Sequence, residues 1–224
     1  MKKIGHRGAK GHAPENTLES IKKALSLGVD GIEIDVHRSA SGELVVFHDF
    51  TLDRMTDTSG EISKFTLNQL KKVKVKGHNQ IPTLSEVLKF IDNKCLLNVE
   101  LKGYDTAKEA SRLIDFFVEK KGWDYSNIIV SSFQFDLLEQ VYRVNKKITL
   151  GVLTDTNMEA AVDFAKTINA YAIHPDYTML TQEIVEELKK DFKVFTWTVN
   201  NLKPIKRIKS YGVDGIISDF PDRL

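Results

Sequence analysis

The sequence predicts an α/β protein built as a closed (β/α)8 barrel, the TIM barrel, with a small insertion after the second strand. Short β-rich runs alternate with longer segments of helical periodicity, which indicates parallel strands joined by crossover helices. There are eight such runs, the number that closes a barrel. The phrase GVDGIEIDV at 28–36 also has an echo, GVDGIISD at 212–219, as expected for two strands that flank the first strand in a ring. A doubly wound open sheet is the alternative.

The predicted strands are short runs rich in valine, isoleucine and leucine, a composition typical of strands that are buried on both faces of a parallel sheet. In chain order they cover Lys2–Gly5, Asp30–Val36, Leu96–Leu101, Asn127–Ser132, Ile148–Val152, Ala170–Ile173, Lys193–Thr198 and Gly215–Ser218.

The segments between these strands carry apolar residues at helical spacing. In 111–118, for example, the apolar residues recur at i, i+1, i+4 and i+5, which indicates one helix face. Asn16 and Glu19 have the spacing of a helix N-cap and its capping-box partner, and we expect that structural role for them. The predicted helices include Thr17–Leu27, Thr106–Lys120, Phe135–Val144, Met158–Ile168, Gln182–Lys190 and Pro204–Ser210.

One segment, approximately 43–82, interrupts the alternation and predicts an insertion. It contains a strand at Leu44–Phe47, a turn-rich stretch, a short helix near Thr66–Lys72, and then the residues Ile81-Pro82-Thr83. No proline- or serine-rich linker divides the chain, so we expect residues 1–224 to form a single barrel domain.

The composition excludes several classes of partner and compartment. With 32 basic and 31 acidic residues the formal net charge is +1, which predicts neither nucleic-acid binding nor stable membrane association. Cys95 is the only cysteine, so no intramolecular disulfide forms. The N-terminal lysines precede no apolar stretch, and no run approaches the ~18 apolar residues that span a bilayer. We therefore expect a cytoplasmic location; the sequence predicts no particular oligomeric state.

Two acidic residues in the second strand are the first sign of a functional site. Glu33 and Asp35 are two residues apart, so their side chains share one face of a buried strand. Repulsion between the two carboxylates and their lost hydration destabilise the folded protein by roughly several kcal/mol unless a positive charge compensates them. In the echo at 212–219 the residue that matches Glu33 is Ile217, so a strand of this kind does not need the acid in order to fold.

Other polar residues stand at the carboxyl ends of predicted strands, the end of a barrel that carries the active site. Glu33, Asp35 and Glu100 supply carboxylate oxygens, the ligands that suit Mg²⁺ or Ca²⁺ better than zinc. The remaining strand-end residues are His6, Arg7, His48 and Lys102.

The charges of these residues suggest the substrate. Three carboxylates, a divalent cation, Arg7 and Lys102 together leave one net positive charge, which a phosphodiester monoanion would neutralise. His6 and His48 supply the general base and general acid that hydrolysis needs near neutral pH. Phe133, His174 and Trp197, at the ends of later strands, are candidates for a substrate pocket.

The motifs around these residues resemble those of the glycerophosphodiester phosphodiesterase family. The matching stretches are GHRGAKGHAPENTLES, GVDGIEIDV, LVVFHDFTLDRMTDTSG, IPTLSEVL, NVELK, VFTWTVN and GVDGIISDFP, and they cover essentially the whole chain.

The resemblance implies a TIM barrel with an inserted segment and hydrolysis of small-molecule glycerophosphodiesters to sn-glycerol 3-phosphate and an alcohol. The nucleophile is either water or the neighbouring glycerol hydroxyl. The resemblance also implies three kinds of site residue: the catalytic acid–base pair His6 and His48; the phosphate contacts Arg7 and Lys102; and the metal ligands Glu33, Asp35 and Glu100.

Two other functions are the alternatives to this one. A phospholipase-type barrel would act on lipid phosphodiesters, but the sequence shows no apolar stretch or basic cluster to dock a lipid surface. A non-catalytic barrel used as a binding module would be favoured by loss of a site histidine or acid, and all of them are present.

Overall fold

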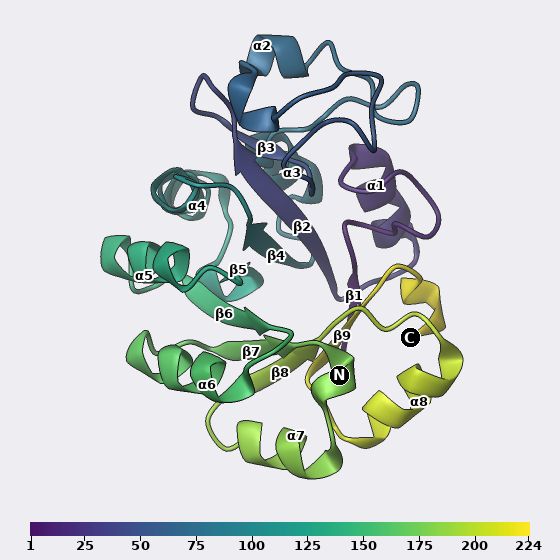
Figure 1. The fold of residues 1–224 in the computed structure, drawn as a ribbon, viewed down its shortest axis with the longest axis vertical. Coiled ribbons are helices and arrows are strands. Elements are labelled where there is room, and N and C mark those ends of the chain that lie inside the picture. The colour runs from purple at the N-terminus through teal and green to yellow at the C-terminus, as the bar shows by residue number, and fades with distance from the viewer.

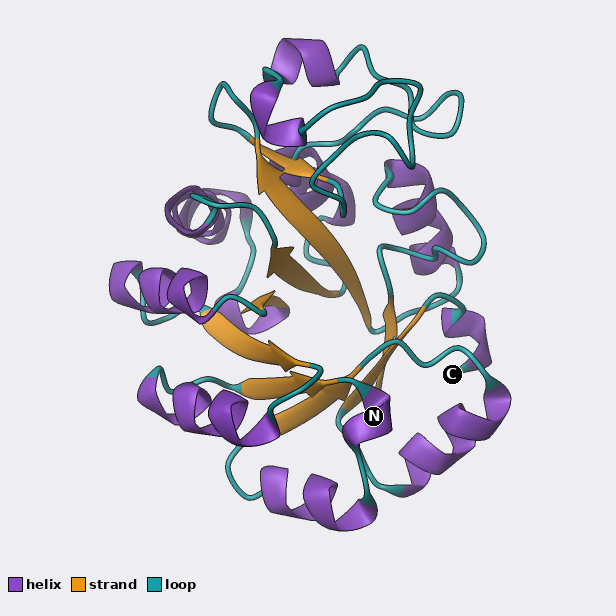
Figure 2. Cartoon of the chain, in the orientation of Figure 1, coloured by secondary structure: helices purple, strands orange, loops and turns teal.

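The computed structural model describes residues 1–224 and shows a closed parallel barrel (Figures 1 and 2). All nine strands belong to one sheet, and β1 pairs with both β9 and β2, which closes the ring. The predicted TIM barrel and the predicted neighbours of the first strand are therefore confirmed. The ring strands are β1 (Lys2–Gly5), β2 (Gly31–Arg38), β4 (Leu96–Leu101), β5 (Ile128–Ser132), β6 (Thr149–Thr154), β7 (Ala172–Pro175), β8 (Lys193–Thr196) and β9 (Gly215–Ser218).

Helices surround the ring, and most of them match the predicted segments (Figure 2). One of them, α3, is absent from the predicted set although its sequence carries a clear signal. Thr83 and Glu86 form a capping box, in which the Glu86 carboxylate accepts the Thr83 backbone N–H at 2.7 Å. The surrounding helices are α1 (Leu18–Ser26), α3 (Leu84–Ile91), α4 (Ala107–Lys121), α5 (Phe135–Val144), α6 (Met158–Thr167), α7 (Gln182–Leu188) and α8 (Leu202–Ser210). No helix combines the length and apolar character needed to cross a bilayer.

Alternation along the strands separates the main core from the functional residues. In β2, Ile32, Ile34 and Val36 pack into the large apolar cluster between the ring and the helices. The residues between them, including Glu33 and Asp35, point into the barrel, because successive strand side chains face opposite sides. A smaller apolar cluster fills the barrel interior and consists of Ile4, Leu96, Ile129, Ala172, Phe195 and Ile217.

The insertion packs as a separate small unit beyond the end of β2, at the top of Figure 1. Its strand β3 (Leu44–Val46) pairs antiparallel with β2 outside the ring, and its short helix is α2 (Leu67–Leu70). The unit has its own apolar cluster, formed by Val45, Phe47, Leu52, Met55, Ile62, Leu70, Val73, Val75 and Ile81. This packing holds the loop that follows β3 next to the end of β2.

Candidate active site

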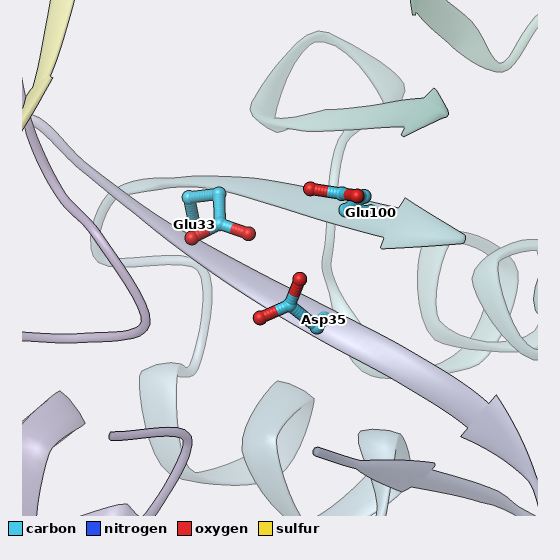
Figure 3. Close-up of side chains that lie close together, drawn as sticks. All are labelled: Glu33, Asp35 and Glu100. Carbon is cyan, nitrogen blue, oxygen red and sulfur yellow. The ribbon is translucent and has the colours of Figure 1, made fainter. Parts of the chain in front are cut away.

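Three carboxylates meet inside the mouth of the barrel, on the inward faces of two adjacent strands. Glu33 and Asp35 project from β2, and Glu100 projects from β4 (Figure 3). The two strands pair in register, so that Asp35 lies opposite Glu100. One oxygen atom from each of the three carboxylates lies within 4.8 Å of the others. The three acids predicted as metal ligands are therefore close enough to share one ion.

The electrostatics of this cluster favour a cation. Burial, followed by the charges of Asp35 and Glu100, raises the pKa of Glu33 well above its usual range. Burial and the charge of Asp35 raise the pKa of Glu100 to about 7. One oxygen of Glu33, Oε1, is buried and has no hydrogen-bond partner. A divalent cation would relieve both the repulsion and the missing contact, so the residues fit a hard, oxygen-preferring ion.

Two basic side chains compensate part of the negative charge. Arg7 Nε lies 3.3 Å from Asp35 Oδ2, and Lys102 Nζ lies 3.0 Å from Glu100 Oε1. Burial lowers the pKa of Lys102, but the carboxylates of Glu100 and Asp35 outweigh it and raise the pKa above its usual value. Both side chains also border the cavity described below, so they can reach an anionic ligand next to the acids.

His6, at the end of β1, forms a dyad with a carboxylate. Its Nδ1 lies 2.5 Å from Asp219 Oδ1, and Asn200 donates a hydrogen bond to the other Asp219 oxygen at 2.9 Å. The second ring nitrogen, Nε2, lies 3.9 Å from Glu33 Oε2. The dyad therefore directs Nε2 toward the carboxylate cluster. Burial lowers the pKa of His6, although Asp219 acts in the opposite direction.

His48, in the insertion, has the same arrangement with a different carboxylate. Its Nδ1 lies 2.7 Å from Asp49 Oδ1, and Lys102 Nζ lies 3.2 Å from its Nε2. Burial is again the main reason that the pKa of His48 is lowered. Because a carboxylate contacts Nδ1 in both dyads, Nε2 is the nitrogen that faces the site in His6 and in His48. In His48 this nitrogen also contacts Lys102.

Arg54 connects Asp49, the partner of His48, with Glu15, the partner of Arg7. Its guanidinium contacts Asp49 at 2.6 and 3.1 Å, and Glu15 at 2.7 and 3.1 Å. Glu15 in turn accepts a hydrogen bond from Arg7 Nη1 at 2.7 Å. Burial alone would raise the pKa of Glu15 and Asp49, but Arg54, together with Arg7 at Glu15 and His48 at Asp49, outweighs it and lowers both pKa values to about 2. The network is therefore ionised throughout the neutral range.

The predicted capping role of Asn16 is wrong. Thr17 is the N-cap of α1, and its side chain accepts the Ser20 backbone N–H at 3.2 Å. Asn16 instead adopts a φ of 57° and turns inward, where its Nδ2 donates to Asp35 Oδ2 at 2.8 Å. Its Oδ1 accepts the backbone N–H of Asp35 at 3.3 Å. Asn16 therefore orients a candidate metal ligand.

The acids, histidines and cations surround a small cavity of about 90 Å³. Two of the three candidates for a substrate pocket, Phe133 and Trp197, line it and contact each other edge to face with ring centroids 5.4 Å apart. His174 does not line the cavity. It is 1% exposed inside the barrel, and neither ring nitrogen has a partner. The structure therefore does not support a contact between His174 and the substrate.

Sequence reasoning assigned no role to several residues of this network. Asp219 directly follows the last strand, and its proximity to His6 results from ring closure between β9 and β1. Asp49 directly follows His48, and the sequence already shows it as an acidic residue near the end of the insertion's strand. Glu15 and Arg54 lie in loops, where no periodicity indicates their direction.

Comparisons with known proteins agree with this geometry. The sequence profile of the glycerophosphoryl diester phosphodiesterase family matches residues 6–223. A glycerophosphodiester phosphodiesterase from Caldanaerobacter subterraneus subsp. tengcongensis is 37% identical over 235 residues, covering 99% of this chain and 95% of the relative. Another from Bacillus altitudinis is 36% identical, covering 100% and 96% of the two chains.

The fold comparison gives the same result. The solved structure of an Oleispira antarctica phosphodiesterase in complex with the product sn-glycerol-3-phosphate matches with a TM-score of 0.90 and 29% identity. The match covers 100% of this chain and 94% of that chain. The resemblance seen in the sequence motifs is thus confirmed, as is the prediction of an enzyme: the chain belongs to the glycerophosphoryl diester phosphodiesterase family.

Proposed function

We propose that this enzyme hydrolyses glycerophosphodiesters, the deacylated head-group diesters of phospholipids, to sn-glycerol 3-phosphate and an alcohol. In this proposal Glu33, Asp35 and Glu100 hold one divalent cation, Mg²⁺ or Ca²⁺, while His6 and His48 transfer protons. Family membership supports the reaction class, and the Oleispira antarctica phosphodiesterase was solved with sn-glycerol-3-phosphate as its product. We further infer a small-molecule substrate and a cytoplasmic location.

One observation carries the proposal: a single small cavity is bordered by every group that diester hydrolysis needs. Acids that fit a cation, two basic side chains for the phosphate and two histidines whose Nε2 atoms face the site all converge there. Of the seven residues predicted as proton donors or acceptors, phosphate contacts or metal ligands, only Asp35 does not border the cavity, and it contacts Arg7 and Asn16. The bordering residues are His6, Arg7, Glu33, His48, Glu100 and Lys102.

The chain's own residues account for binding and proton transfer. Arg7 and Lys102 donate hydrogen bonds to the non-bridging phosphoryl oxygens and stabilise the charge that develops there. One histidine removes the proton of the nucleophile, and the other protonates the departing alcohol. Asp219 and Asp49 hold the imidazoles with Nδ1 protonated, so that each Nε2 can accept or deliver the proton.

The cation site is argued from the donor set. The three carboxylates provide hard oxygen ligands, and the unpartnered Glu33 Oε1 is the atom most in need of a positive partner. A bound divalent cation would polarise the phosphoryl oxygens as a Lewis acid and neutralise part of the carboxylate charge.

The proposal is tested by measuring sn-glycerol 3-phosphate release from glycerophosphocholine and glycerophosphoethanolamine with a coupled dehydrogenase assay. We expect EDTA to abolish turnover and added Mg²⁺ or Ca²⁺ to restore it. His6→Ala and His48→Ala should each reduce kcat by on the order of 10²–10⁴. His78→Ala is the control, because His78 is 75% exposed and lies outside the cavity.

Activity that is indifferent to the chelator would contradict the cation site. A near-normal rate in His6→Ala or His48→Ala would remove that histidine from the mechanism. Release of the alcohol without sn-glycerol 3-phosphate would overturn the proposed products.

A further inference from the structure

His37 is a buried histidine whose one hydrogen bond is to the main chain of His48. It stands two positions after Asp35, on the same face of β2, and the residue is 2% exposed. Its Nε2 lies 3.0 Å from the carbonyl oxygen of His48. Because a carbonyl oxygen only accepts hydrogen bonds, His37 is the donor, and Nε2 is the nitrogen that carries the hydrogen.

This bond is the only hydrogen bond that reaches the main chain of His48. His6 differs, because its main-chain N–H donates to the Ser218 carbonyl at 2.9 Å and so fixes it to the ring. The side chain of His48 is held by Asp49, but Asp49 is its neighbour in the chain and moves with it. The bond from His37 therefore ties the loop that carries His48 directly to a strand of the ring.

The imidazole of His37 is itself held in place by two neighbours. The ring of Phe50 contacts it edge to face, with ring centroids 4.9 Å apart. On the loop after β4, Gly103 lies so close that a Cβ at this position would be 2.9 Å from His37 Nδ1. The ring cannot turn away from the His48 carbonyl without displacing one of these residues.

The loop that carries His48 also borders open space. Phe50 and Thr51, which follow His48 and Asp49, line a cavity of about 710 Å³. Phe50 is 50% exposed. Packing on this side of the loop is therefore incomplete, so the position of His48 depends on its hydrogen bonds more than it would in a fully packed loop.

We propose that His37 is a positioning residue, which holds the His48 carbonyl and thereby keeps the imidazole of His48 in the place that proton transfer requires. This inference rests on the proposed function, since it assumes that His48 transfers a proton. His37 does not line the cavity of about 90 Å³ that the acids border, so it acts only through His48. A displacement near 1 Å of a positioned group lowers a rate by up to about 100-fold, so the loss of this bond should be measurable.

The experiment compares two replacements of nearly equal shape. His37→Gln keeps an N–H donor at about the position of Nε2, whereas His37→Met has the same length and no donor. Each is made in the wild type and in His48→Ala, and kcat and KM are measured for sn-glycerol 3-phosphate release from glycerophosphocholine. His78→Met is the matched control, because the His78 side chain is 75% exposed and lies outside the cavity.

In the otherwise wild-type enzyme we expect His37→Met to lower kcat by about 10- to 100-fold with little change in KM. His37→Gln should stay closer to the wild type than to His37→Met, and His78→Met should leave the rate unchanged. In the His48→Ala background His37→Met should have no further effect, because the group that His37 positions is gone. Circular dichroism verifies the fold, and His37→Ala takes the place of His37→Met if that variant does not fold.

Three results would overturn the inference while leaving the proposed function intact. In the first, His37→Met keeps the kcat of the wild type. In the second, His37→Gln and His37→Met lose the same rate, which would show that the N–H donor is not what matters. In the third, His37→Met lowers the rate as much in His48→Ala as in the wild type, which would show that His37 acts through packing and not through His48. A near-normal rate in His48→Ala alone would instead contradict the proposed role of His48, and this inference with it.

Discussion

Arg54 holds Asp49 with two nitrogens of its guanidinium, Nε at 2.6 Å from Oδ2 and Nη2 at 3.1 Å from Oδ1. The same guanidinium holds Glu15, which is the partner of Arg7, while Asp49 is the partner of His48. One side chain of the insertion thus positions both a candidate acid–base histidine and a candidate phosphate contact. This relationship explains how an insertion outside the ring becomes part of the site.

Replacing Arg54 should weaken catalysis without unfolding the protein. We expect Arg54→Ala to lower kcat/KM by about 10- to 100-fold, because displacements near 1 Å of positioned groups have effects of this size. Added guanidinium ion should restore part of the rate, and Arg54→Lys should retain less than the rescued variant because it lacks the planar fork. Arg143→Ala is the control, since Arg143 pairs only with Glu139 on the exposed face of α5. A rate loss that guanidinium does not rescue would argue for a purely structural role.

Removing the charge that supports His6 should reduce kcat more than it affects substrate binding. Asp219→Asn keeps the shape of the side chain but no longer stabilises a protonated imidazole, so we expect kcat to fall on the order of 10²-fold with a small change in KM. Asp222→Asn provides a matched comparison, because Asp222 pairs with His12 at 2.6 Å in an exposed dyad. Equal effects of the two substitutions would exclude a specific role for Asp219.

Replacing Glu33 with the residue found at the matching position of the eighth ring strand should show whether the acid is needed for folding or only for function. Glu33→Ile introduces at position 33 the residue type that stands at the matching position of the similar stretch 212–219, Ile217. We expect an inactive protein with a native circular dichroism spectrum. In the absence of metal it should unfold at a higher temperature than the wild type at pH 8, because a buried acid that lies beside Asp35 and Glu100 is gone. A folded variant with wild-type activity would show that Glu33 is dispensable.

The raised pKa of Glu100 predicts a pH-dependent stability of the metal-free protein. Well below pH 4.5 the carboxyl is protonated in both the folded and the unfolded state. As pH rises toward about 7, the unfolded chain ionises first, so the folded state loses stability. The difference in unfolding free energy between wild type and Glu100→Gln isolates this effect, and a displacement of this size corresponds to roughly 3 kcal/mol. Saturating Mg²⁺ or Ca²⁺ should remove this pH dependence. A difference in unfolding free energy between the two proteins that stays constant from pH 4.5 to 8 would contradict the prediction.

The sequence by itself determined the architecture and the inner carboxylates of this protein. Alternation of β-rich and helical segments is a local property of the chain, and it predicts parallel strands and crossover helices. The count of eight strands and the similarity of residues 28–36 and 212–219 add the prediction of ring closure. The spacing of Glu33 and Asp35 likewise determines that they share a strand face, since side-chain direction alternates with a period of two.

Only the tertiary structure decided which partners these residues have. His6 and Asp219 are 213 positions apart and meet because β9 closes the ring against β1. Asn16 has a local capping signal, yet its two hydrogen bonds to Asp35 compete with that role and prevail. Hydrogen bonds and burial depend on positions in space, and residues in loops carry no periodicity from which those positions can be read.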